Sequence, residues 1–82
     1  MAKTQLKPMS PQDESTWFKV RVEMKINAMT SDFAKEITYH VHRGVVTLQG
    51  KVPSPEAVKA AERVANSLPD VLGVVNNLTV AS

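Results

Sequence analysis

Cysteine is absent from the 82 residues, so the chain can form neither a disulfide nor a thiolate metal site. Aromatic residues make up only 5% of the chain, which leaves little material for stacking nucleic acid bases. Strong charge of one sign is also lacking: ten Lys and Arg stand against eight Asp and Glu, and the two signs are interspersed. We therefore expect no nucleic acid partner.

Long apolar runs are missing as well. The N-terminal stretch MAKTQLKPMSPQ lacks the roughly 7–15 apolar residues of a signal peptide. No segment reaches the roughly 18 apolar residues that cross a bilayer. We therefore expect a cytoplasmic protein. If the chain is a piece of a longer exported protein, the expectation changes to the periplasm or a membrane surface.

The composition that remains is typical of one small folded domain, with 43% apolar and 22% charged residues. A domain of this size buries only roughly 60% of the surface that its unfolded chain exposes, so its core is thin. Residues 1–12 are polar and contain Pro8 and Pro11. We expect a flexible N-terminal tail over residues 1–12 and a single domain over residues 13–82.

The segment FKVRVEMKIN, residues 18–27, has two interpretations. Its apolar and polar residues alternate, as in a half-buried strand, which the local pattern slightly favours. It follows DEST, residues 13–16, a run suited to the start of a helix. A helix here would be apolar on two sides, which is unusual in a small domain. The two stripes would be Trp17, Val20, Met24, Ala28 and Phe18, Val22, Ile26, Met29.

Two later segments, ITYHVH (residues 37–42) and VVTLQGKV (residues 45–52), predict a β-hairpin. Both alternate, and only two residues separate them. A two-residue loop places Val41 opposite Val46, so that the apolar faces of the two strands coincide. The opposite face of the sheet then carries His40, His42, Val45 and Thr47.

Glycine has a structural purpose at two positions of this hairpin. Gly44 supplies the positive φ that a tight turn requires. Arg43 before it would be strained in a type I′ turn, so we expect a loop with a Gly bulge instead. Gly50 marks a place where the strand backbone meets a helix.

The remainder of the chain predicts a helix and a last strand. Ser54 suits the N-cap, Pro55 the first helical position and Glu56 the positive end of the helix dipole. The helix runs to about residue 68, and residues 71–80, VLGVVNNLTV, form a strand. We assign Gly73 a turn or packing role, and expect Val74, Leu78 and Val80 in the core. A right-handed crossover makes this strand parallel to the second strand, which is then central in a three-stranded mixed sheet.

The stretches GVVTLQGKV (residues 44–52) and VVNNLTV (residues 74–80), on either side of an Ala-rich helix, resemble the BON domain (bacterial OsmY and nodulation domain). The resemblance spans roughly residues 13–80. It implies an α+β fold, an αββαβ sandwich with both helices on one face of the sheet. It also implies that FKVRVEMKIN is helical, because Asp13, Lys19-Val20-Arg21 and Met24 fall at the family's spacings.

Two departures from the family pattern concern loops. Arg43 stands where family hairpins often have Asn, and Asp70 stands where the family usually has Gly. The resemblance places Asp70 in a loop to which the family's lipid-binding activity has sometimes been assigned.

His40 and His42 are the residues of the sequence that most resemble metal ligands. Their spacing on one strand face would allow them to share an ion, with Glu36 as a candidate third ligand. We interpret them instead as polar residues on the open sheet face. No grouping of residues suggests catalysis, and we expect neither a metal nor another cofactor.

The resemblance implies a non-enzymatic module that attaches to anionic phospholipid. Its candidate surface is the second stripe of the first helix with the basic residues beside it: Phe18, Val22, Ile26, Met29, Lys19, Arg21 and Lys25. One alternative is a protein-interaction module, including a homodimer through the first helix or the open sheet face. Another is cytosolic potassium sensing, which the resemblance suggests for some relatives but for which no site is evident.

Overall fold

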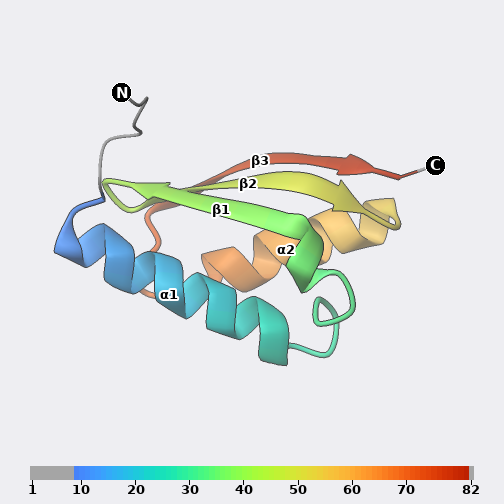
Figure 1. Ribbon diagram of the computed structural model, residues 1–82, viewed down its shortest axis with the longest axis horizontal. Helices are drawn as coiled ribbons and strands as arrows, with labels where there is room; N and C mark the ends of the chain where they lie inside the picture. The colour runs from blue at the N-terminus through green and yellow to red at the C-terminus, as the bar shows by residue number, and fades with distance from the viewer. Residues whose placement is uncertain (1–8, 82) are drawn as a thin grey trace, which may run out of the picture.

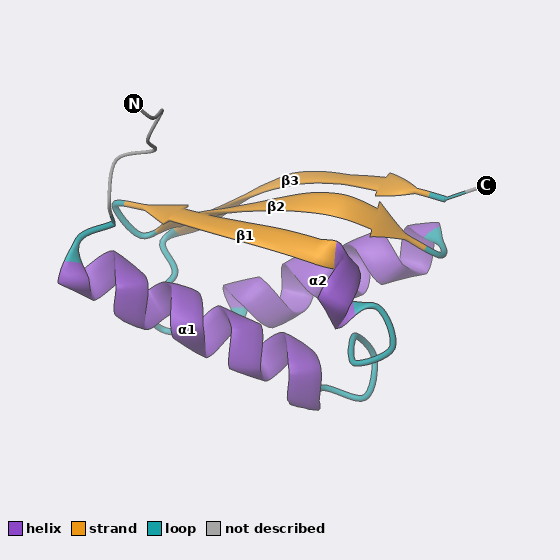
Figure 2. Ribbon diagram, in the orientation of Figure 1, coloured by secondary structure: helices purple, strands orange, loops and turns teal. Residues whose placement is uncertain are grey.

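The structure, a computed structural model, describes residues 9–81. Its elements are α1 (Pro11–Ile26), a short 3-10 turn η1 (Ala34–Glu36), β1 (Ile37–His42), β2 (Val45–Val52), α2 (Pro55–Asn66) and β3 (Gly73–Val80). Both helices lie on one side of the sheet, and no described element covers the other side (Figures 1 and 2). The predicted αββαβ sandwich is confirmed.

The sheet has the order β1-β2-β3, with β2 central. β1 pairs with β2 antiparallel, and Val41 lies opposite Val46 as predicted. β2 pairs with β3 parallel, with Val46 beside Val74. The mixed sheet therefore follows from one tight hairpin and one crossover through α2.

The segment FKVRVEMKIN is helical, which confirms the interpretation based on family spacing over the one based on alternation. The helix begins where the Ser10 hydroxyl accepts a hydrogen bond from the Asp13 amide at 3.1 Å, with Pro11 in the first turn. Its buried side chains follow at helical spacing: Asp13, Thr16, Val20 and Met24. Both Val20 and Met24 are fully buried beneath the sheet.

The helix α1 begins two residues before the predicted start of the domain at residue 13. Pro11 and Gln12 belong to the helix, and Met9 packs against the core. Ser10-Pro11 is the same kind of helix start as Ser54-Pro55, which begins α2. Residues 1–8 of the predicted tail lie outside the described residues.

The core lies between the sheet and the two helices. Its α2 side is largely alanine, which lets the helix approach the strands closely. The buried apolar residues are Val20, Met24, Phe33, Ala34, Ile37, Val41, Val46, Leu48, Val52, Ala57, Ala60, Ala61, Val64 and Ala65.

The three β3 residues predicted to lie in the core differ in burial. Val74 and Leu78 pack at the margin of the core, but Val80 is 45% exposed, contrary to expectation. Val80 ends an edge strand, where only one flank has a neighbouring strand.

The β1–β2 turn differs from the predicted Gly-bulge loop. Arg43 has φ 52° and Gly44 has φ 84°, so both residues of a two-residue loop have positive φ, as in a type I′ turn. The left-handed conformation of Arg43 costs free energy. The two turn amides donate hydrogen bonds to the side chain of a distant residue, and these bonds offset part of that cost.

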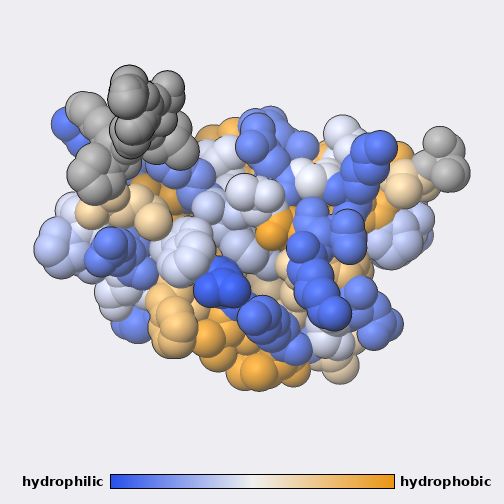
Figure 3. All heavy atoms as spheres, viewed as in Figure 1, coloured by the Kyte–Doolittle hydropathy of each residue, from blue (hydrophilic) through white to orange (hydrophobic). Residues whose placement is uncertain are grey.

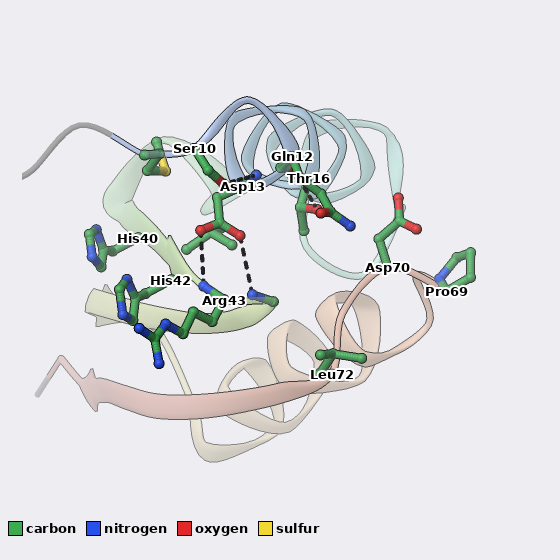
Figure 4. Close-up of a pocket in the computed structure, with 13 residues that line it drawn as sticks. Ser10, Gln12, Asp13, Thr16, His40, His42, Arg43, Pro69, Asp70 and Leu72 are labelled. Atoms are coloured by element: carbon green, nitrogen blue, oxygen red, sulfur yellow. Dashed lines mark hydrogen bonds between the residues drawn. The ribbon is translucent and has the colours of Figure 1, made fainter.

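That residue is Asp13, whose buried carboxylate accepts hydrogen bonds from both turn amides (Figure 4). The Arg43 N–H donates to Oδ2 at 2.9 Å, and the Gly44 N–H donates to Oδ1 at 3.2 Å. The Arg43 amide, and to a smaller extent the Gly44 amide, lower the pKa of Asp13 from its ordinary value of 3.8, while burial acts in the opposite direction. The first turn of α1 is thereby bonded to the tip of the hairpin.

The glycines differ in how strictly they are required. Gly50 has φ 133°, and a Cβ there would overlap the backbone carbonyl oxygen of Glu36 at the end of η1. A Cβ on Gly44 would come within 2.8 Å of the flexible Leu72 side chain. At Gly73 a Cβ would meet only a Val45 methyl carbon at 3.9 Å, so the structure gives no steric reason for glycine there.

We expect Gly50→Ala to lower the free energy of unfolding by about 3 kcal/mol, because the substitution adds both backbone strain and a clash with backbone. Chemical denaturation measures this loss. Gly73→Ala is the matched control and should stay within about 0.5 kcal/mol of wild type. Equal losses in the two variants would contradict the close approach of Gly50 to η1.

We expect Asp13→Asn to destabilise the domain at pH 7, because the two turn N–H groups bond to different carboxylate oxygens and one of them would face an amide NH2, which is a donor. The lowered pKa also makes a pH prediction. The ionised carboxylate stabilises the fold above its unfolded pKa near 3.8, and that contribution is lost as the pH falls through the lower folded value. Denaturation at pH 7 and pH 3 should therefore show a smaller pH effect in Asp13→Asn than in wild type.

Glu14→Gln is the control for this experiment, since it removes an exposed carboxylate from the same helical turn without touching the hairpin. It should keep the wild-type pH effect. A wild-type pH effect in Asp13→Asn would contradict the contact between Asp13 and the turn.

Candidate functional site

The second apolar stripe of α1 faces away from the sheet. We call Phe18, Val22, Ile26 and Met29 the outer stripe; Met29 follows the end of the helix. Phe18 and Met29 are each 58% exposed and Ile26 is 68% exposed. Hydrophobic atoms gather along the lower edge of the space-filling view, over α1 (Figure 3). The exposure predicted for this stripe is therefore present.

The three basic residues of the predicted surface have different surroundings. Lys19 Nζ lies 2.9 Å from Asp70 Oδ2, in an exposed ion pair that joins α1 to the loop after α2. Arg21 stacks over the Trp17 ring, with its guanidinium carbon 4.8 Å from the ring centroid. Lys25 has no carboxylate within 4.0 Å among residues 9–81. Asp70, the departure from the family pattern, thus holds one of the three cations.

Trp17 fixes the orientation of α1 against the sheet. Its ring is partly buried against the core, and its Nε1–H donates a hydrogen bond to the Tyr39 carbonyl oxygen of β1 at 3.0 Å. The bond satisfies the indole N–H at the rim of the core. With this side of α1 anchored, the outer stripe faces away from the protein.

The open sheet face carries the other predicted residues. His40, His42 and Val45 are exposed, and Thr47 is half-buried, on the side of the sheet away from the helices. Across residues 9–81, no group of three or more His, Cys, Asp or Glu is placed to hold a metal ion. Glu36 was the candidate third ligand, and it does not complete such a group. Within the described residues, the structure therefore identifies no metal site at this face.

A hollow of about 710 Å³ lies beside the hairpin turn, between the start of α1 and the loop after α2. In Figure 4, His40, His42 and Arg43 lie on one side of it and Asp70 on the other, with Asp13 between them. The Asp13 carboxylate is occupied by the two turn amides. It is therefore a structural anion here and is not free to act as a base.

Sequence reasoning missed the role of Asp13 and the pairing of Lys19 with Asp70. Asp13 was noted as part of a helix-start run and as a residue at family spacing, but not as a partner of the turn, which lies 30 positions away. Its position three residues after the Ser10 cap was a usable signal that it lies in the first helical turn. Nothing local connects Lys19 with a residue 51 positions away.

Comparison with known proteins places this arrangement in a family. None of the helices within residues 9–81 is long and apolar enough to cross a bilayer. A search of curated proteins found no match to the chain. The sequence profile of the BON domain, however, matches residues 15–82, which includes all three strands and α2 and most of α1. The chain therefore belongs to the BON domain family, a group of generally non-catalytic modules associated with membrane and phospholipid binding.

Proposed function

We propose that this domain is a non-enzymatic module that attaches to anionic phospholipid surfaces through the outer stripe of α1. The observation that carries the proposal is the exposure of Phe18, Ile26 and Met29 on the side of α1 opposite its buried residues. An apolar stripe with basic residues beside it suits a helix lying in the membrane interface. Membership of the BON family supports the same ligand class.

The interaction has an apolar and an electrostatic component. Full burial of a large apolar side chain contributes about 1.5–3 kcal/mol, so shallow insertion of a few half-exposed ones gives a part of that each. A basic residue near an anionic bilayer adds about 1 kcal/mol. Because Asp70 already pairs with Lys19, Arg21 and Lys25 are the more available cations. Attachment by a single domain is therefore weak, and several copies on one surface would strengthen it.

Self-association is the second candidate function, and the same stripe supports it. A two-fold contact would bury Phe18, Val22 and Ile26 of one copy against those of another. The uncovered sheet face offers a second surface for a partner protein, with Val45 and Val75 among its exposed residues. Light scattering at high protein concentration tests the homodimer, and a monomeric mass would count against it.

Potassium sensing stays a prediction without an assigned site. If the domain binds potassium, potassium should raise its unfolding temperature more than sodium does at the same concentration. Equal unfolding temperatures in the two salts would argue against it.

Flotation with vesicles of phosphatidylglycerol and phosphatidylcholine at low salt tests membrane attachment. We expect wild type to float and the double variant Phe18→Ser/Ile26→Ser to partition roughly tenfold less or weaker still, because each substitution removes about 1 kcal/mol or more of apolar transfer free energy. Both side chains are exposed, so the fold should survive, as circular dichroism can check.

Leu72→Ser/Val75→Ser is the matched control for flotation. It removes two exposed apolar side chains, 78% and 45% exposed, that lie outside α1. We expect this variant to float like wild type. Failure of wild type to float with phosphatidylglycerol, or equal losses in both double variants, would contradict attachment through the outer stripe.

A further inference from the structure

A second groove, separate from the hollow at the hairpin turn, lies between α1 and the free edge of β1. It holds about 470 Å³. The residues around it come from α1, η1 and β1: Trp17, Arg21, Lys25, Ala34, Lys35, Ile37, Thr38 and Tyr39. Three of them are cations and none is an acid, so the groove is locally far more basic than the chain as a whole, whose net charge is +2.

Arg21 is held in place before any ligand arrives. Its side chain is half-buried and stacks on the Trp17 ring, with 4.8 Å between the guanidinium carbon and the ring centroid. The guanidinium carbon lies over the ring, and none of the guanidinium N–H groups donates a hydrogen bond to a residue within 9–81. A pre-oriented guanidinium with free donors suits bidentate binding of a phosphate.

Lys25 and Lys35 extend the positive charge along the rim. Lys25 lies one helical turn after Arg21 on α1, whereas Lys35 comes from η1. Among residues 9–81 the single ion pair within 4.0 Å is that of Lys19 with Asp70, so none of the three groove cations has a carboxylate partner there. Three unpaired cations around one groove favour a ligand with more than one negative charge.

The two aromatic side chains that line the groove have their polar groups hydrogen-bonded within the protein. Trp17 Nε1–H donates to the Tyr39 carbonyl oxygen at 3.0 Å, and the Tyr39 hydroxyl donates to the Ala34 carbonyl oxygen at 3.2 Å. Burial raises the pKa of Tyr39, and the nearby charge of Arg21 acts against that rise. Thr38 also lines the groove at this edge of β1.

We propose that this groove is a binding site for a phosphate monoester, held by Arg21, Lys25 and Lys35. The dianionic form of a monoester matches three cations better than a phosphodiester with one charge does. The phosphate can belong to a lipid headgroup or to a soluble metabolite. In the lipid case the inference rests on the proposed membrane function and adds a headgroup preference to it. In the soluble case the groove acts independently of the outer stripe.

The protein's single tryptophan lines this groove, so its fluorescence reports directly on occupancy. The soluble probe is glycerol 3-phosphate, with sodium chloride at the same ionic strength as the reference. The lipid probes are phosphatidylcholine vesicles containing either phosphatidic acid, a monoester, or phosphatidylglycerol, a diester. We expect a saturable change with glycerol 3-phosphate or with phosphatidic acid vesicles, and none with chloride.

Substitutions identify the site. Arg21→Gln, Lys25→Gln and Lys35→Gln should each weaken the response, Arg21→Gln by about tenfold or more, since it removes charged hydrogen bonds. Lys59→Gln, an exposed lysine of α2 that lines neither hollow, is the matched control with the same change in charge and should bind like wild type. If Arg21→Gln does not fold, the two lysine variants carry the test, with amide shifts of Lys35 and Thr38 as a second readout.

The outcomes separate this inference from the proposed function. A response to glycerol 3-phosphate that survives Phe18→Ser/Ile26→Ser supports the groove even if wild type fails to float. A response to phosphatidic acid alone, lost in Arg21→Gln, supports a lipid source. No response to either monoester, an equal response to chloride, or an equal loss in Lys59→Gln would overturn the groove proposal, whether or not wild type floats on phosphatidylglycerol.

Discussion

The contact between Asp13 and the β1–β2 turn is the constraint on which the rest of the structure depends. One carboxylate accepts hydrogen bonds from two successive turn amides, at 2.9 and 3.2 Å. The same residue lies in the first turn of α1, where a negative charge suits the helix dipole. The contact therefore stabilises a turn with positive φ at Arg43 and fixes one end of α1 to the sheet.

Fixing α1 in this way decides which of its two apolar stripes is buried. Val20 and Met24 pack beneath the sheet, and Trp17 holds the helix to β1 through the Tyr39 carbonyl. Within residues 9–81, the three-stranded sheet and two helices provide no further layer to cover the other stripe. Phe18 and its neighbours therefore remain exposed, which is why we propose them as an interaction surface.

Much of the sheet was predictable from sequence, because alternation and a two-residue link fix a hairpin's register locally. The helical state of α1 followed from the family spacing and not from the local pattern, since the outer stripe makes the segment alternate like a strand. The turn type and the start of α1 depend on the distant pair Asp13 and Arg43 and on a cap at Ser10. For the candidate site, the exposure of the outer stripe followed from the spacing of apolar residues along α1. The basic groove did not, because it needs Lys35 of η1 to lie beside α1, and no local sequence pattern predicts that tertiary contact.

The central claim is that the outer face of α1 is the surface that meets the membrane. Amide and methyl NMR spectra of the domain, with and without phosphatidylglycerol nanodiscs, test it most directly. The account predicts that broadening and shift changes concentrate at Phe18, Val22 and Ile26, while β3 and the outer surface of α2 stay unchanged. Changes centred on the open sheet face around His40 and Thr47, or none along α1, would contradict it.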